Sequence, residues 1–422
     1  ARAQSQVQDT LMLNVDKLFE LVIQNNPTLK VATENVEVAK QGVLVAKNNM
    51  LPNANVSVSG FYLSDANVYS PKFEKVTTQE MPHFGNNVGI EANQLLWKGG
   101  VVREGIKISE MQVDIANLEY TSSEQQARLA ALGYYLDLYK LHNQSKVYTQ
   151  NIALAQERLK NITKLFNQGM VTRNDVIRAE LQISNLNLSK LTIDNNILIL
   201  NKQLNVAIGL DDALVVIPLN EIVSKDISLE GLNSYQQMAL ENNPNVQLTQ
   251  KVVDINESAV KVAQKNWYPT LAAFAGNTLQ RPLTNKTPAV DMYANTWNAG
   301  LSLSFDIGSL WKNKRVVHQS KLEMNRAIAQ QKEVEAMIGI GVNAAYIKHN
   351  EALVQKSTLA TNKQLADENY RIMEKKYNNQ LAIILDLIDA SNAKLDAELQ
   401  YTNAEINIIY AYYKLLKEVG KI

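Results

Sequence analysis

The sequence predicts a mainly helical fold that carries a small set of β-strands. Two long stretches, 83–217 and 289–422, contain no proline, and their apolar residues recur every three or four positions, which is typical of long amphipathic helices. Four segments of about ten residues alternate polar and apolar side chains instead, which is the period of a β-strand. The same order of elements occurs twice along the chain, which indicates a duplicated fold.

Short motifs recur in the two halves at a nearly constant separation. Asn25-Asn26-Pro27 returns 217 residues later as Asn242-Asn243-Pro244. Further along, Asp175-Val176-Ile177 returns 211 residues later as Asp386-Leu387-Ile388. The second offset is smaller because the loop between the second pair of strands is shorter. Matches in the same order at these separations predict one fold built twice.

The first repeat is predicted over residues 1–217 and the second over 218–422, the two forming one intertwined fold. Each has the order helix, strand, strand, long helix and shorter helix. The expected bounds in the first repeat are helix 28–50, strands 53–66 and 86–98, and helices 103–166 and 172–208. Those in the second repeat are helix 245–266, strands 270–281 and 295–306, and helices 309–376 and 383–418.

The helix lengths fit rods rather than a globular core. At 1.5 Å per residue, helix 103–166 is about 95 Å long, whereas helices 172–208 and 28–50 are about 55 Å and 35 Å long. The two shorter helices placed end to end therefore match the long one. Each repeat has a break between its two longest helices, where Gly169 is expected to take a left-handed conformation in the first half and an Asn of Asn378-Asn379 in the second.

The four strands have the length and the pattern of strands that cross a membrane. About ten residues cross a bilayer as a tilted strand. Four tryptophans lie at or near the strand ends, where an interfacial aromatic belt belongs: Trp97, Trp267, Trp297 and Trp311. Four strands cannot close a membrane barrel, since about eight is the minimum, so two or three copies are needed. Hairpins packed on a soluble core are the alternative explanation of the same pattern.

Composition and motifs exclude several other functions. Forty-two basic and forty-two acidic residues give no net charge, which argues against a nucleic-acid partner. The chain has no Cys, no run of 18 apolar residues, no phosphate-binding glycine loop and no catalytic motif, and its four His are isolated. We therefore expect no enzyme activity, no cofactor and no metal site. Ala1-Arg2-Ala3 has the small-x-small form that signal peptidase cuts, either as a processing remnant or as an introduced sequence.

From about Leu13 to Gly420, the chain resembles the TolC-like outer membrane factors, the exit ducts of bacterial efflux pumps and type I secretion systems. The resemblance rests on motifs that are weak singly and specific in this order. They are Asn26-Pro27, Asn243-Pro244, Leu51-Pro52, Tyr268-Pro269, Leu96-Trp97-x-Gly99-Gly100, Phe305-Asp306-x-Gly308, Gly169-Met170-Val171-x-x-x-Asp175-Val176 and Asp386-x-x-Asp389-Ala390.

This resemblance implies a homotrimer in the outer membrane with a twelve-stranded β-barrel. A long α-helical barrel extends into the periplasm, where the hairpin tips meet a periplasmic adaptor protein and an inner-membrane pump. Equatorial segments are implied at 1–24, at 210–231 and at the C-terminal end. The implied function is a passive gated channel from periplasm to exterior. A soluble coiled-coil scaffold with small β-hairpin caps is the alternative function.

The resemblance also assigns roles to residues near the hairpin turns. Asp386 and Asp389 lie three apart on one helix face and match the channel constriction, where a ring of carboxylates favours cations. Asp175 and Tyr377 match gate links. The chain departs from the family at Ala382, where a basic residue is usual, and Arg173 and Arg178 are the alternatives for its ion pair. The turns that match adaptor-docking tips are Gly169-Met170 and Gln380-Leu381.

Overall fold

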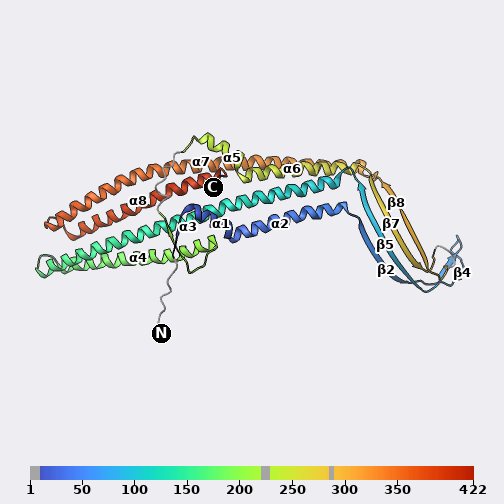
Figure 1. Ribbon diagram of the computed structural model, residues 1–422, viewed down its shortest axis with the longest axis horizontal. Helices are drawn as coiled ribbons and strands as arrows, with labels where there is room; N and C mark the ends of the chain where they lie inside the picture. The colour runs from blue at the N-terminus through green and yellow to red at the C-terminus, as the bar shows by residue number, and fades with distance from the viewer. Residues whose placement is uncertain (1–9, 220–228, 285–288) are drawn as a thin grey trace, which may run out of the picture. The chain divides into compact units, whose positions relative to one another are not determined.

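The computed structural model describes residues 10–219, 229–284 and 289–422 (Figure 1). They form two compact units, each of which contains segments from both halves of the chain. The hairpin unit comprises Ala1–Asn35, Ala116–Thr249 and Gln331–Ile422, and the strand unit comprises Val36–Ile115 and Gln250–Gln330. Parts of the expected equatorial segments, at 1–9 (with Ala1-Arg2-Ala3) and 220–228, lie outside the described residues.

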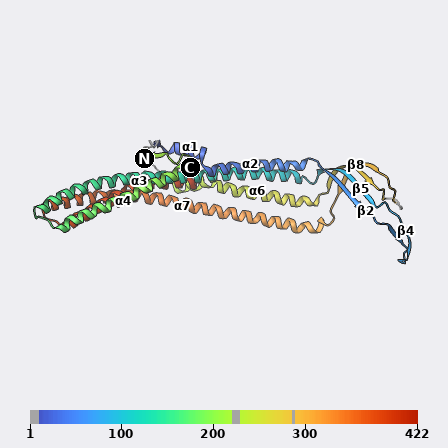
Figure 2. The same cartoon turned by 90° about the horizontal axis from the view of Figure 1, so that it is seen from below.

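The strand unit contains one four-stranded antiparallel sheet in the order β2-β5-β7-β8 (Figure 2). Its strands are β2 (Asn53–Tyr62), β5 (Phe84–Trp97), β7 (Thr270–Arg281) and β8 (Ala294–Ser304). Single 3₁₀ turns, Asn48–Met50 and Lys265–Trp267, lead into β2 and β7. The outer strands β2 and β8 each have only one neighbour, so both edges of the sheet are unpaired.

Strand register separates the side chains of this sheet into two faces. Val58 lies opposite Val88, and Ala275 lies opposite Ala299, so the apolar positions of neighbouring strands share one face. That face is uncovered in the single chain, where Val58 is 73% exposed. The opposite face is polar and includes Ser57, which pairs with Gly89. The sheet is thus apolar on one side and polar on the other.

A second, small sheet was not expected from the sequence. The sequence predicts no further strand between the expected strands 53–66 and 86–98, but β3 (Ala66–Tyr69) and β4 (Lys75–Gln79) pair there as an antiparallel hairpin. Ser70 closes the turn, because its hydroxyl accepts hydrogen bonds from the backbone N–H groups of Lys72 (3.2 Å) and Glu74 (3.3 Å). The strands are too short for a periodic pattern to reveal them.

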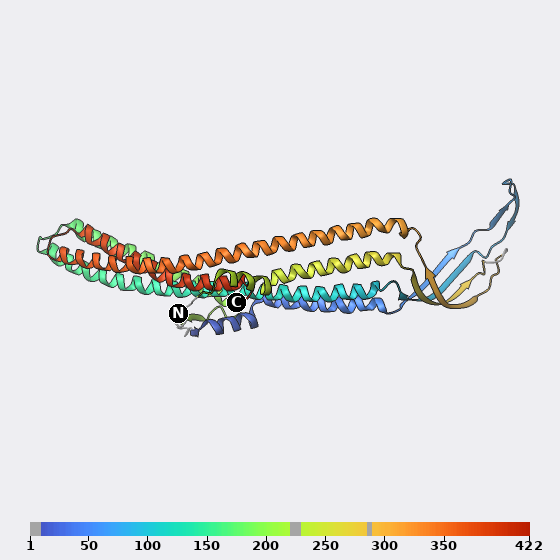
Figure 3. The ribbon, with the colours of Figure 1, turned by 90° about the horizontal axis from the view of Figure 1, so that it is seen from above.

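Four helices contribute residues to both units: α2 (Pro27–Lys47), α3 (Val101–Asn167), α6 (Pro244–Gln264) and α7 (Ser309–Asn378). The other helices belong to the hairpin unit: α1 (Val15–Asn25), α4 (Arg173–Ile208), α5 (Leu232–Asn242) and α8 (Ile384–Glu418). There α3 runs beside α4 and α7 runs beside α8 (Figure 3). Across the described ranges, the helices are either too short or too polar to cross a membrane.

The largest core cluster of the hairpin unit surrounds a short parallel sheet. Strands β1 (Thr10–Leu13) and β6 (Val215–Pro218) pair with each other, although more than 200 residues separate them in the chain. Tyr135 of α3 is fully buried beneath them, and its hydroxyl donates a 2.8 Å hydrogen bond to the carbonyl of Leu13. Leu18, Leu132, Leu204 and Val216 complete the centre of this cluster. Apolar burial therefore joins α1, α3, α4 and the small sheet.

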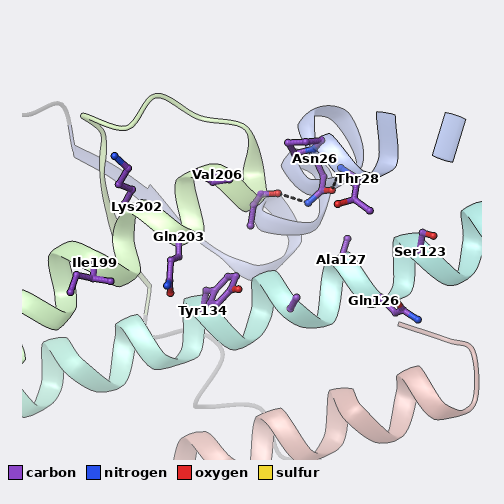
Figure 4. A pocket seen from close by; sticks show the side chains of 13 residues that line it. Asn26, Thr28, Ser123, Gln126, Ala127, Tyr134, Ile199, Lys202, Gln203 and Val206 are labelled. Atoms are coloured by element: carbon purple, nitrogen blue, oxygen red, sulfur yellow. Dashed lines mark hydrogen bonds between the residues drawn. The ribbon is translucent and has the colours of Figure 1, made fainter. Parts of the chain in front are cut away.

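The two Asn-Pro motifs form matching helix junctions. The Asn26 side chain donates a 2.7 Å hydrogen bond to the carbonyl of Ala207, near the end of α4, and accepts one from the N–H of Thr28 (Figure 4). The Asn243 side chain does the same with the carbonyl of Glu418, near the end of α8, at 2.8 Å. Each Asn thus links the end of one helix to the start of another, beside proline at the first helical position.

Glycine completes each junction. Gly209 and Gly420 follow α4 and α8 with φ of 65° and 80°, the left-handed region that favours glycine. A Cβ atom on Gly209 would collide with the backbone of Asn25, and one on Gly420 would collide with that of Asn242. The close approach of two helix ends therefore requires glycine at both positions.

A cavity of about 790 Å³ adjoins the first junction, lined by residues of α2, α3 and α4 that include Thr28, Tyr134 and Lys202 (Figure 4).

The asparagine bonds should contribute measurably to stability. Asn26→Ala and Asn243→Ala each leave a helix-terminal carbonyl without its partner, and we expect each to lower the free energy of unfolding by about 1–3 kcal/mol. Chemical unfolding in detergent, followed by circular dichroism, measures this. Asn49→Ala is the matched control, because the Asn49 side chain bonds to Ala46 in an exposed position, and we expect a change below about 0.5 kcal/mol. Equal effects for the three variants would contradict the role given to the junctions.

His349 is a buried titratable group in the hairpin unit. It is 0% exposed, and neither ring nitrogen has a hydrogen-bond partner among the described residues. Its ring lies edge-on to that of Tyr412 in α8, with centroids 6.2 Å apart. Burial lowers the pKa of the His349 imidazole below its ordinary value of 6.5. Burial therefore favours the neutral form of this side chain in the folded protein.

Stability should consequently fall in mild acid. Below pH 6.5 the unfolded chain binds a proton that folded His349 does not, so we expect a loss of up to about 1.4 kcal/mol per pH unit, continuing until the folded pKa is reached. His349→Phe should flatten the dependence of unfolding free energy on pH between about 5 and 7. The control is His318→Phe at an exposed position of α7, which should leave the slope as it is. An unchanged slope in His349→Phe would refute this assignment.

Candidate functional site

The first hairpin tip lies between α3 and α4. Gly169 has φ of 76°, and the following N–H, that of Met170, donates to the carbonyl of Leu165 at 2.9 Å. This is how a left-handed residue closes the C-terminus of a helix. Met170 is 52% exposed, so the turn presents an apolar side chain.

The second tip, between α7 and α8, has the same geometry with different residues. The N–H of Leu381 donates to the carbonyl of Lys376 at 2.8 Å, and the left-handed residue before it is Gln380, with φ of 63°. The expectation that Asn378 or Asn379 takes this conformation is therefore wrong. The left-handed position follows the helix end by a fixed number of residues, and the 211-residue offset places it at Gln380, opposite Gly169. Leu381 is 76% exposed, like Met170 at the first tip.

The two predicted carboxylates nearest the tips are each the third residue of a helix. The Asp175 carboxylate accepts 2.8 Å hydrogen bonds from the backbone N–H and the hydroxyl of Thr172, the residue before α4. The Asp386 carboxylate accepts a longer one, 3.4 Å, from the N–H of Ile383, the residue before α8. Both therefore cap helix N-termini, where the helix dipole favours negative charge. Capping by Asp386 still leaves its side chain exposed.

Asp389 lies one turn beyond Asp386 in α8, and its side chain is also exposed. Three residues of separation bring both carboxylates to one side of the helix, as expected. Arg178 occupies the matching position in α4 at the 211-residue offset, so the two tips differ in charge there. Arg173, one of the two alternatives for the missing basic residue at Ala382, lies 3.7 Å from Glu180.

Tyr377 lies in the apolar cluster beneath the tips. This tip cluster comprises Ile162, Val176, Ala179, Tyr370, Ile384, Leu387 and Ile388 as buried members, and Tyr377 packs against it. The Tyr377 hydroxyl is buried and has no hydrogen-bond partner among the described residues. Burial raises the pKa of this phenol, and the negative charge of Asp175 raises it further. Tyr377 and Asp175 are thus close enough to interact electrostatically, while the Asp175 carboxylate is hydrogen-bonded to Thr172.

Polar contacts that the sequence does not predict join the two hairpins. Arg158 of α3 donates a 3.1 Å hydrogen bond to the Tyr370 hydroxyl in α7, and that hydroxyl donates a 2.7 Å bond to Glu374. Gln182 of α4 donates to Asn392 of α8 at 2.7 Å. Tyr370 and Glu374 are four residues apart, so that pair was visible in the sequence. The partners from the other hairpin were not, because their pairing depends on how the helices pack.

Lys394 of α8 extends these contacts. Its ammonium group lies 3.1 Å from the Asp367 carboxylate of α7 and 5.1 Å from the centre of the Tyr370 ring. The Arg158 guanidinium lies 5.7 Å from the centre of the same ring. Two cations thus lie near the Tyr370 ring, and its hydroxyl links Arg158 to Glu374. Within the described residues, His, Asp and Glu side chains do not gather in threes that could hold a metal ion.

The tryptophans lie toward both ends of the sheet. Trp97 ends β5, Trp267 lies in the turn before β7 and Trp311 lies near the start of α7, so these three are at the end next to the helices. Trp297 lies near the opposite end, in β8. Two further aromatic residues lie at that end: Tyr62 and Phe84 pair across β2 and β5, with ring centroids 5.7 Å apart.

Comparison with known proteins identifies the family. The family described as "Outer membrane efflux protein" matches residues 18–210 and 236–421, which is most of the chain. The chain belongs to the outer membrane efflux protein family. Outer membrane efflux protein BepC of Brucella suis biovar 1 (strain 1330) is 23% identical over 410 residues, covering 94% of this chain and 83% of BepC. Outer membrane protein TolC of Salmonella enteritidis is 21% identical over 417 residues, covering 94% and 81%.

A solved structure of CusC, from a study of folding and transmembrane channel formation, has the same fold as this efflux protein. It matches with a TM-score of 0.80 at 13% identity and covers 97% of this chain and 92% of that one. The expected family and outer membrane location are confirmed, as is the mainly helical fold with strands in two halves. The roles given to Asp386, Asp389, Asp175 and Tyr377, to the tip residues and to the aromatic belt stay predictions.

The non-glycine residue at the second tip should cost stability. A left-handed conformation costs a residue with a side chain about 1 kcal/mol or more, so we expect Gln380→Gly to raise the free energy of unfolding by about 1 kcal/mol. Gly169→Gln is the reciprocal variant and should lower it by a similar amount. Unfolding curves of both variants in detergent measure the two changes. Shifts of the same sign in both variants would contradict the equivalence of the two turns.

Proposed function

We propose that three copies of this outer membrane efflux protein form a passive, gated exit duct. The observation that carries the proposal is the four-stranded sheet with one apolar face, one polar face and two unpaired edges. Because four strands are too few to close a barrel, the edges β2 and β8 must meet those of other copies. Three copies supply twelve strands, with the apolar face toward lipid and the polar face around a water-filled lumen. Two copies supply eight strands, and side chains nearly fill the interior of an eight-stranded barrel.

The helical hairpins form the periplasmic part of the proposed duct. In three copies, the α3–α4 and α7–α8 hairpins give a barrel of twelve helices. Asp386 and Asp389 of each copy then contribute to one ring of six carboxylates at the tunnel mouth. Such a ring attracts cations and repels anions. Both side chains are exposed in the single chain, as this role requires.

Gating is proposed to occur by movement of the α7–α8 hairpin away from the α3–α4 hairpin. The contacts that resist this movement are the Arg158–Tyr370 and Gln182–Asn392 hydrogen bonds and the tip cluster. Separation exposes the cluster to water, which is unfavourable, so the closed arrangement is stable without a partner. Asp175 and Tyr377 lie at the same level and belong to the proposed gate.

A periplasmic adaptor protein and an inner-membrane pump are the proposed partners, in a tripartite efflux pump or a type I secretion system. The exposed side chains of Met170 and Leu381 give the two tips an apolar contact surface of the kind that partner proteins cover. Membership of an efflux family favours transport over catalysis, so the energy for export is assigned to the pump. The outer membrane location argues against the soluble coiled-coil scaffold.

Planar-bilayer recordings test the duct and its constriction together. The purified protein should give discrete, cation-selective conductance steps. We expect Asp386→Ala/Asp389→Ala to lower the ratio of cation to anion permeability severalfold, because it removes six charges from the proposed ring. Glu20→Ala, at an exposed position of α1 outside the two hairpins, is the matched control and should leave the ratio unchanged.

The two parts of the proposal fail in different ways. Channels whose selectivity survives the double substitution would keep the duct and reject the constriction. Folded protein that inserts into the bilayer without producing channels would reject the duct itself.

A further inference from the structure

The polar face of the four-stranded sheet carries a single unpaired charge. Within the four strands, the charged residues are Glu91 and Arg281, and Arg281 lies at the end of β7 in an ion pair with Asp291 at 2.7 Å. Glu91 lies in the middle of β5, opposite Asn55 of β2 and Gly276 of β7. Its side chain is exposed, and no described residue forms a hydrogen bond or ion pair with it. The charge of Glu91 is therefore not compensated by any described side chain.

An aromatic residue shares the polar face with this carboxylate. Phe274 of β7 is opposite Asn93, so it is the diagonal neighbour of Glu91 across the β5–β7 pair. Diagonal neighbours of this kind are about 7–8 Å apart, within reach of long and aromatic side chains. The Phe274 position interrupts a face that otherwise has small or polar side chains along β7: Thr270, Ala272, Gly276 and Thr278. The alternation of β7 alone does not predict an aromatic residue there.

Glycine on the neighbouring strand makes room for the Phe274 ring. A Cβ atom on Gly300 would lie 2.9 Å from Cζ of Phe274, which is too close, so the ring lies over Gly300 of β8. A Cβ atom on Gly276 would lie 3.8 Å from Cγ of Glu91 and 3.1 Å from Oδ1 of Asn298. Gly300 therefore leaves the space that the Phe274 ring occupies, and Gly276 faces the stem of the Glu91 side chain.

We propose that Glu91 and Phe274 form a selectivity belt in the strand-built part of the duct, one that favours cations carrying apolar groups. This inference rests on the proposed function, in which the polar face lines a lumen and three copies place three such pairs at one level. The carboxylates attract positive charge along the path. An aromatic face attracts quaternary ammonium groups and contacts their alkyl arms. The belt would act separately from Asp386 and Asp389, which lie at the ends of helices in the other unit.

The test uses the full-length protein with Asp386→Asn/Asp389→Asn as the background, so that the tip carboxylates do not mask the belt. Reversal potentials in asymmetric KCl measure the ratio of potassium to chloride permeability. Adding Glu91→Gln should lower this ratio about two- to fivefold. Asn55→Asp in the same variant places a carboxylate directly across the strand pair and should restore the ratio. Glu80→Gln, outside the four strands, is the matched control and should change nothing.

A second readout tests Phe274. Tetrapropylammonium should block the potassium current of the background channel, and Phe274→Leu should weaken the block severalfold while keeping the potassium to chloride ratio.

If Glu91→Gln does not assemble, Asn55→Lys offers the same test. The ammonium group of the introduced lysine offsets the Glu91 carboxylate and should also lower the ratio of potassium to chloride permeability. A ratio unaffected by Glu91→Gln or Asn55→Lys would overturn the role of Glu91, and an unaltered block in Phe274→Leu would overturn that of Phe274. Absence of any channel in the unsubstituted protein would instead reject the proposed function.

Discussion

The hydrogen bonds of Asn26 and Asn243 with the last turns of α4 and α8 are the contacts on which the helical architecture depends. A helix normally ends with carbonyl groups that need partners, and the chain usually turns away to supply them. Here an asparagine side chain from a distant segment supplies one partner, and a left-handed glycine lets the two backbones approach closely. One helix therefore begins where another ends, without a bulky connection between them. Both halves of the chain use this arrangement.

Several surfaces of the single chain lack a partner within that chain. The sheet has an apolar face without cover, a polar face without a lid and two free edges, and the hairpin tips present carboxylates and apolar side chains to solvent. Each unfinished surface has a matching partner in the proposed duct: lipid, water, neighbouring copies or an adaptor. Inside the chain, by contrast, Tyr135 and the surrounding apolar residues form a closed core around β1 and β6. Stability and function are thus assigned to different parts of the molecule.

The sequence was informative where periodicity alone decides structure. Helical spacing predicted long helices, and strand alternation predicted the two faces of β2 and β8, because each pattern directly reflects backbone geometry. It failed at Gln380, since the left-handed position depends on where the helix ends rather than on residue preference. It also missed the β3–β4 hairpin, which is too short to show a period. At the candidate site, Asp386 and Asp389 were predicted from spacing and resemblance and stay predictions. The contacts of Arg158 and Lys394 depend on packing between hairpins. Packing of that kind leaves no local signal.

The open edges of the sheet have a consequence for how the protein must be made. Before assembly, β2 and β8 each present a row of unpaired backbone groups beside an apolar surface, which is a template for adding strands from any other chain. Incorrect strand pairing between newly made copies can continue from chain to chain without limit, whereas in a closed ring every edge strand is paired. In the proposed duct, biogenesis is therefore a competition between ring closure and open-ended aggregation. Conditions that keep the newly made chains dilute, or shield their edges until they reach lipid, favour the ring.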